Sequence, residues 1–213
     1  MGRYESLRRR GILGIPGYAL VPLLVDLGIN MMVYYGTRLI NAHRHLHDFT
    51  TALDLMVPVD ARSTTVYFGC YLFWAAGLIL VSRESEEFCW RLLGGNLIGK
   101  LICAAVYLIL PTTNVRPEVI GTGFFDEVLR WLYRADVADN LFPSLHCYMS
   151  WYLCRWLGRR KRATRPGMFL AYAFTILIFY STLATRQHYI IDIPGGVAVA
   201  EIALWLEPRL KTR

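Results

Sequence analysis

A histidine and an aspartate stand four residues apart in the C-terminal part of the sequence, as His188 and Asp192. One helical turn brings residues at this spacing to the same face. A carboxylate that holds one imidazole nitrogen fixes the tautomer, and the other nitrogen is then free to attack an electrophile or to accept a proton. The pair is therefore a candidate nucleophile with its orienting group.

A second histidine, His146, follows a proline and Ser144 at the edge of another apolar segment, while Arg116 and Arg186 lie in polar connections. In-line cleavage of a phosphate ester or anhydride needs a nucleophile, cations on the equatorial oxygens and an acid for the leaving group. Arginine binds phosphate oxygens in pairs. We therefore predict phosphoryl chemistry on a lipid, with His146 as the general acid and with Arg116, Arg186 and Ser144 as phosphate ligands.

The composition predicts that these residues are positioned by membrane helices. Of the 213 residues, 55% are hydrophobic and only 18% are charged, whereas soluble domains are nearer a quarter charged. The apolar residues form long runs, which indicates that residues 1–213 form one polytopic helical domain. The net charge of +7 comes from basic residues that flank these runs. Membrane topology and anionic lipid headgroups explain such flanks better than nucleic acid does.

The apolar runs predict an all-α bundle of six transmembrane helices. They lie at about residues 12–40, 66–81, 92–110, 146–158, 168–183 and 189–206. Lysine and arginine are concentrated at the N-terminus, in the second and fourth connections and in the C-terminal tail. The positive-inside rule then places both termini in the cytoplasm, with the protein in a plasma or inner membrane. In this topology both histidines lie together on the extracytoplasmic side.

Two charged residues, Asp26 and Lys100, fall inside predicted spans. Charged groups at this depth pair with each other, extend to the interface or belong to a functional site. Pairing of the two is the interpretation that we prefer. Lys100 also remains a candidate for the phosphate site.

No metal or cofactor is expected. Two histidines and an aspartate could bind zinc, but Asp192 is better used to orient His188, and the nearby arginines oppose a cation. The alternating residues His43, His45 and His47 have no further ligand close by, which favours a stretch facing lipid headgroups. The five cysteines show no metal or redox spacing and no disulfide framework.

These motifs resemble the signatures of a known family, the type-2 phosphatidic acid phosphatase superfamily. Its second motif is similar to Pro143-Ser144-Leu145-His146 in this chain. Its third motif is similar to Ser181 followed by His188-Tyr189-Ile190-Ile191-Asp192 and Gly195-Gly196. Arg116-Pro117 resembles the end of the first motif, so the motif-bearing region is about residues 111–200. The resemblance implies a metal-independent enzyme in which His188 is the nucleophile, Asp192 its partner and His146 the acid.

The sequence departs from the family pattern at two basic positions. The lysine usual in the first motif is replaced by Ile109, and the arginine usual after the serine of the third motif is replaced by Thr182. Either Lys100 or Arg186 is a candidate replacement. The departures make the chain look more like the branch that contains inositol phosphorylceramide and sphingomyelin synthases.

We therefore expect an integral membrane lipid phosphatase that cleaves a phosphomonoester or diphosphate through a phosphohistidine intermediate at the extracytoplasmic face. Its expected partners are a phosphate-bearing membrane lipid and the bilayer. One alternative is a phospholipid or sphingolipid head-group phosphotransferase that uses the same site. A second alternative is a non-catalytic protein that binds or transports lipid phosphates.

Overall fold

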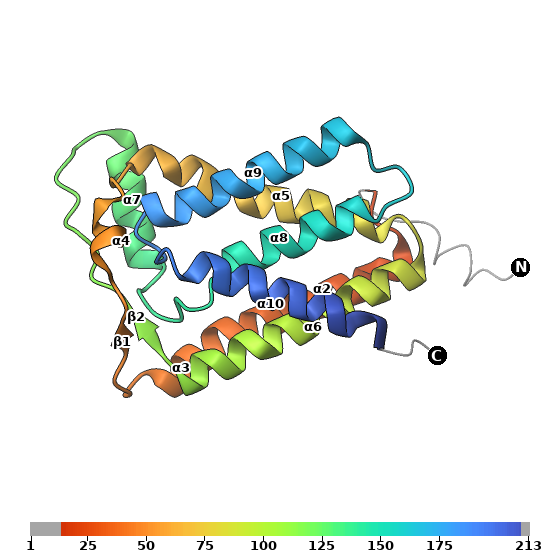
Figure 1. Ribbon diagram of the computed structural model, residues 1–213, viewed down its shortest axis with the longest axis horizontal. Helices are drawn as coiled ribbons and strands as arrows, with labels where there is room; N and C mark the ends of the chain where they lie inside the picture. The colour runs from red at the N-terminus through yellow and green to blue at the C-terminus, as the bar shows by residue number, and fades with distance from the viewer. Residues whose placement is uncertain (1–13, 210–213) are drawn as a thin grey trace, which may run out of the picture.

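Long apolar stretches form a helical bundle with a small polar layer at one end (Figure 1). The computed structural model describes residues 14–209. The long helices are α2 (Gly17–Met31), α5 (Thr64–Ser82), α6 (Glu86–Ile109), α8 (Leu145–Gly158), α9 (Arg165–Ala184) and α10 (Asp192–Leu206). Helix α2 continues through a π-helical turn, η1 (Met32–Gly36), into α3 (Thr37–Asn41), and α10 ends in the 3-10 turn η3 (Glu207–Arg209).

Shorter elements make the polar layer at one end of the bundle (Figure 1). They are β1 (His47–Asp48), α4 (Ala52–Met56), η2 (Ala61–Ser63), β2 (Thr112–Thr113) and α7 (Phe124–Ala135). Strands β1 and β2 pair in parallel, with His47 opposite Thr112. The amphipathic helix α7 buries Leu129 and Leu132 against Tyr67 of α5, which fixes the layer to the bundle.

Hydroxyl side chains set the points at which three of the long helices begin. Ser85, Ser144 and Thr164 precede α6, α8 and α9, and each hydroxyl accepts a hydrogen bond from a backbone N–H three residues further on. Such a cap satisfies one of the amides that have no partner within the helix.

Helix α8 is the central element, because it packs against α5, α9 and α10. Its contact with α10 is close at Gly196, where a Cβ atom would lie 2.6 Å from the carbonyl oxygen of Ser144 and 2.9 Å from the Cβ of Cys147. Only glycine allows the two backbones to approach in this way. The starts of α8 and α10, which carry both predicted motifs, are therefore held side by side.

Four helical segments within residues 14–209 are long and apolar enough to cross a membrane: Gly17–Asn41, Ala61–Ser82, Glu86–Ile109 and Arg165–Ala184. The expectation of a helical membrane protein is confirmed, with the short pair β1–β2 as an addition that the sequence did not predict. The predicted count of six spans is not, because α8 and α10 have only 14 and 15 residues, fewer than the roughly 20 that a helix needs to cross a bilayer. Residues 12–13 of the first predicted span, the basic N-terminus and the end of the tail lie outside the described residues.

The predicted pairing of the two intramembrane charges is confirmed. The Nζ atom of Lys100 lies 2.9 Å from Oδ1 of Asp26, and it also donates to the Asp26 carbonyl oxygen. The Nδ2 atom of Asn96 donates to the same carboxylate, and the Tyr148 hydroxyl donates to Oδ1 of Asn96 at 2.7 Å. This buried network joins α2, α6 and α8. Lys100 is thus engaged by Asp26 and does not line the cavity described below.

The Lys100→Met substitution is expected to destabilise the fold by about 3–5 kcal/mol, because it leaves the Asp26 carboxylate buried without a counter-ion. Thermal unfolding of the purified protein in detergent measures the effect. Lys161→Met, which removes an exposed lysine, is the matched control, and adding Asp26→Asn to Lys100→Met should restore part of the loss. An unchanged unfolding temperature for Lys100→Met would contradict this account of the network.

Candidate active site

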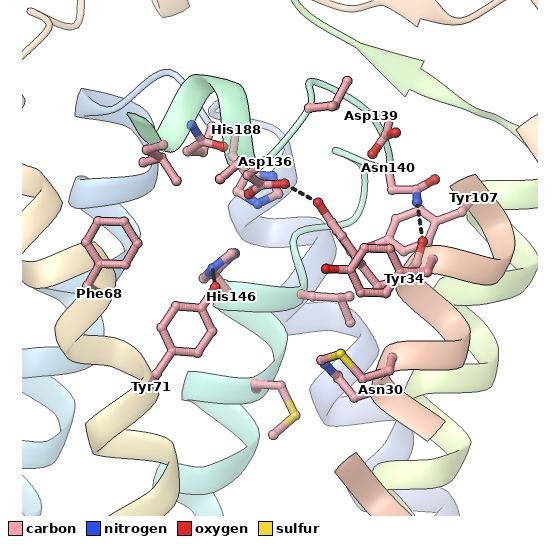
Figure 2. Close-up of a pocket in the computed structure, with 18 of the residues that line it drawn as sticks. Asn30, Tyr34, Phe68, Tyr71, Tyr107, Asp136, Asp139, Asn140, His146 and His188 are labelled. Atoms are coloured by element: carbon pink, nitrogen blue, oxygen red, sulfur yellow. Dashed lines mark hydrogen bonds between the residues drawn. The ribbon is translucent and has the colours of Figure 1, made fainter. Parts of the chain in front are cut away.

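A cavity of about 440 Å³ lies at the end of the bundle where α8 begins (Figure 2). Its wall comes from α2, η1, α5, α6, α7 and α8 and from the connections that precede α7, α8 and α10. His146 and His188 both line it, with their ring centroids 5.6 Å apart. The structure therefore brings together the two histidines that the sequence analysis singled out.

His188 lies in the tight connection between α9 and α10, and Asp192 is the first residue of α10. The Nδ1 atom of His188 lies 2.9 Å from Oδ2 of Asp192 and 3.0 Å from the carbonyl oxygen of Leu141. Both neighbours are acceptors, so Nδ1 carries the proton and Nε2 carries the lone pair. The carboxylate of Asp192 is fully buried and also accepts from the Tyr189 amide. The predicted pairing of His188 with Asp192 is present.

The imidazole of His146 is held by aromatic rings and not by a carboxylate. The rings of Tyr67, Trp74 and Tyr71 have their centroids 4.6, 5.5 and 6.0 Å from that of His146. The Tyr71 hydroxyl oxygen lies 3.5 Å from Nε2 of His146 (Figure 2). All three rings come from α5 at intervals of four and three residues. The sequence analysis missed them, although this spacing, which puts side chains on one face of a helix, was available as a signal.

Arg116 contributes a guanidinium group to the cavity wall. It donates to the carbonyl oxygens of Tyr133 and Asp136 and, at 2.7 Å, to Oε1 of Gln187, and it lies over the Tyr133 ring. Burial lowers the pKa of Arg116, but an arginine remains charged even so. The side chain is thus a cation held in place by neutral groups, and its charge is available to a bound phosphate.

Ser144 and Arg186 are placed differently from the other predicted phosphate ligands. Ser144 is fully buried, its hydroxyl caps α8, and it does not line the cavity. Arg186 has a φ angle of 53°, and its guanidinium donates to the carbonyl oxygens of Asp54, Leu55 and Val57 around α4. Neither side chain reaches the cavity in this structure. The phosphate-binding roles predicted for both remain predictions that this geometry does not support.

A cluster of acidic and phenolic side chains forms another part of the wall, and sequence reasoning missed it. Oδ1 of Asp136 accepts a hydrogen bond from Tyr34 (Figure 2), and Oδ2 accepts one from Tyr67. Arg38 donates to both oxygens of Asp139 at 2.6 and 2.9 Å. The π-helical turn η1 carries Tyr34 into this cluster, as π turns often do at functional sites. The contacts fix the connection that leads into α8.

The polar layer holds the His188 connection from outside. Oδ1 of Asp54 accepts from the Ile190 amide at 2.7 Å, and Oδ2 accepts from the Thr51 amide and hydroxyl. Burial by itself raises the pKa of Asp54, but these hydrogen bonds outweigh it and the pKa lies below its ordinary value. The carboxylate is therefore charged. Its contribution to stability is complete above the pKa of the unfolded chain and is lost as the pH falls through the lowered folded value.

These features define a helical membrane protein with two histidines, an orienting carboxylate and an arginine at one cavity. A sequence model of the PAP2 superfamily matches residues 27–206, and the chain belongs to this superfamily. The resemblance to type-2 phosphatidic acid phosphatases seen in the motifs is thereby confirmed. No curated protein and no solved structure matches the chain.

The Asp54→Ala substitution is expected to release the connection at residues 186–190, because the Ile190 amide loses its acceptor. Loss of a buried hydrogen-bonding group costs about 1–3 kcal/mol. Trypsin should then cleave after Arg186 at least severalfold faster, which mass spectrometry of the fragments measures. Asp60→Ala, which removes an aspartate that pairs with the exposed Arg62, is the control. Equal cleavage after Arg186 in both variants would show that Asp54 does not hold the connection.

Proposed function

We propose that this protein is an integral membrane lipid phosphatase that hydrolyses a lipid phosphomonoester or diphosphate through a phosphohistidine on His188. The observation that carries the proposal is the hydrogen bond of 2.9 Å between Nδ1 of His188 and the buried carboxylate of Asp192. It leaves Nε2 as the nucleophilic nitrogen of a residue that lines the cavity. Membership of the PAP2 superfamily supports phosphatase or phosphotransferase chemistry on lipid-like substrates.

In the first step, Nε2 of His188 attacks phosphorus while the bond between phosphorus and the lipid oxygen breaks. The leaving oxygen takes a proton from His146, and Asp192 stabilises the cationic ring that forms on His188. In the second step, water attacks the phosphohistidine and gives its proton to His146. The nitrogen–phosphorus bond breaks, and phosphate leaves. Arg116 neutralises charge on the phosphoryl oxygens in both steps.

The lining of the cavity supports a lipid substrate. Apart from the polar groups above, its wall contains Met31, Phe68, Trp131 and Met149. Such a surface favours an apolar chain next to a phosphate group.

A head-group phosphotransferase is the second candidate, and the small number of cations favours it. With Ile109 and Thr182 at the two family positions and with Arg186 turned away, Arg116 is the sole arginine or lysine among the described residues that line the cavity. A phosphodiester carries one negative charge, so it needs less neutralisation than a dianionic monoester. A lipid hydroxyl would then replace water in the second step. The buried pairing of His188 with Asp192 argues against the other alternative, a non-catalytic protein that binds or transports lipid phosphates.

We further propose six membrane-crossing helices, with α8 and α10 as the two short ones. The basic connection at residues 159–165 lies at the opposite end of the bundle from the histidines (Figure 1). The positive-inside rule assigns that end to the cytoplasm. Both termini would then be cytoplasmic and the histidines extracytoplasmic.

The His188→Ala variant is expected to lower turnover by at least about 10³-fold, as loss of a nucleophile does. The assay measures phosphate released from phosphatidic acid and from a polyprenyl diphosphate, with and without added diacylglycerol or ceramide. His43→Ala, which removes an exposed histidine outside the cavity, is the control.

Each outcome of this assay is informative. Free phosphate that disappears in His188→Ala identifies a hydrolase, whereas a new phospholipid that forms only with the acceptor identifies the transferase. A His188→Ala protein with the turnover of the parent would contradict the nucleophile assignment.

The Arg116→Gln variant is expected to raise KM by about 10- to 100-fold, since a charge-assisted hydrogen bond contributes about 1.5–3 kcal/mol. Initial rates over a range of lipid concentrations in mixed micelles give KM and kcat separately. Arg62→Gln removes an exposed cation at the same end of the bundle and serves as the control. If KM stayed the same in Arg116→Gln, phosphate would be bound elsewhere.

A further inference from the structure

A second groove, of about 320 Å³, lies between α5, α9 and the C-terminal end of α8. It shares no lining residue with the cavity of the histidines. Helix α8 runs from that cavity to the connection at residues 159–164, so the groove is at the opposite end of the bundle (Figure 1). The groove is therefore distinct from the candidate active site.

The walls of the groove are apolar and open toward the outside of the bundle. Phe73 of α5 and Phe174 of α9 meet edge to face, with ring centroids 5.5 Å apart. Leu80 of α5 and Leu170 of α9 line the groove and are exposed. Both helices are long and apolar enough to cross a membrane, so this opening would face lipid chains. The shape and chemistry fit one acyl chain lying between α5 and α9.

The rim of the groove is strongly basic. Arg160 and Arg162 line it, and Lys161 and Arg165 stand beside them in the sequence. Glu84 forms an ion pair with Arg160 at 3.2 Å. Within residues 14–209, no ion pair involves Arg162. Glu84 thus offsets the charge of Arg160, and Arg162 leaves an excess of positive charge at the groove.

The N-terminal end of α9, with the positive end of its helix dipole, lies at the same rim. Thr164 caps this helix of 20 residues, and Thr164 and Gly167 both line the groove. Pro166 has no N–H, and the Gly167 and Met168 amides donate to the hydroxyl and the carbonyl of Thr164, so the helix dipole and not a set of free amides favours an anion there. The apolar groove therefore ends at a site that suits a phosphate.

We propose that this groove binds an anionic membrane phospholipid as a permanent, non-substrate ligand. One acyl chain lies between α5 and α9, and the headgroup phosphate lies against Arg162 and the first turn of α9. Basic pockets between membrane helices bind anionic headgroups in this way. The excess of positive charge favours a lipid with a net negative charge over a zwitterionic one. No histidine lines the groove, so the lipid is held there without being cleaved.

The experiment uses the full chain purified in a mild detergent. Phosphatidylglycerol and phosphatidylcholine with identical acyl chains are titrated, and native mass spectrometry counts the lipids that stay bound. The parent protein should retain one phosphatidylglycerol in preference to phosphatidylcholine. Arg162→Gln should weaken this binding about five-fold, because a basic residue near a lipid headgroup contributes about 1 kcal/mol. Binding of phosphatidylcholine should stay the same.

Two neighbouring alanines of α5 offer a matched pair for the acyl chain. Ala76 and Ala75 are both exposed, but only Ala76 lines the groove. Ala76→Phe should reduce the count of bound phosphatidylglycerol by one, whereas Ala75→Phe should leave the count unchanged. A lipid bound in the cavity of the histidines would remain in both variants.

Three results would overturn the proposal. They are equal affinity of the parent for the two lipids, unchanged phosphatidylglycerol affinity in Arg162→Gln, and equal loss of lipid in Ala75→Phe and Ala76→Phe. Should Ala76→Phe fail to fold, the titrations of the parent and of Arg162→Gln still decide the question. Neither depends on the proposed enzymatic activity.

Discussion

The carboxylate of Asp192 is the group on which the arrangement of the candidate active site depends. It is fully buried, and Oδ2 accepts hydrogen bonds from Nδ1 of His188 and from the Tyr189 amide. The backbone carbonyl of the same residue accepts from the Ser144 amide, which links the start of α10 to the start of α8. Its Oδ1 atom has no hydrogen-bond partner among the described residues. A buried carboxylate with spare acceptor capacity gains most when a positive charge forms beside it. In the proposed mechanism, the cationic ring that forms on His188 provides that charge.

A second constraint comes from carboxylates outside the bundle, which fix connections that would otherwise have few contacts. Asp54 holds the Ile190 amide, and Asp48 accepts from the Tyr189 hydroxyl at 2.9 Å. These contacts flank His188 on its C-terminal side. On the other side of the cavity, Asp136 and Asp139 tie the connection before α8 to η1 and α3. The histidines are thus set by two kinds of force: apolar packing orients the helices, and charge-assisted hydrogen bonds orient the loops.

The sequence predicted those features that depend on local spacing or on the cost of burying a charge. His188 and Asp192 are four residues apart, so one turn of chain decides whether they meet. Lys100 and Asp26 were predicted to pair because a buried charge has few alternatives.

Ser144 and Arg186 were harder to place. A serine before a helix can cap it, and a hydroxyl used as a cap is no longer directed at a ligand. The carbonyl groups that bind Arg186 come from α4, about 130 residues earlier in the chain, and no local pattern reveals such a contact. The spacing of Tyr67, Tyr71 and Trp74 places them on one face of α5, but a helix that is apolar all round does not show that this face meets His146.

The balance of charge around the cavity limits what the site can bind. The positive charge of Arg116 shares the cavity wall with the negative charges of Asp136 and Asp139. Arg38 forms ion pairs with both aspartates, and its single charge neutralises only part of their two. A dianionic phosphate would therefore enter a region with little net positive potential. Hydrogen bonds from the phenols of Tyr34 and Tyr67 to Asp136 spread its charge. A substrate with a single negative charge on phosphorus matches this environment better than a dianion does, because each uncompensated charge in a low-dielectric site has a large cost. A phosphodiester, in which the reacting phosphorus carries one ionised oxygen, fits that condition. The terminal phosphorus of a monoester or a diphosphate, which is the one that leaves as phosphate, carries up to two, so the charge around the cavity weighs in favour of the proposed transfer to a lipid hydroxyl.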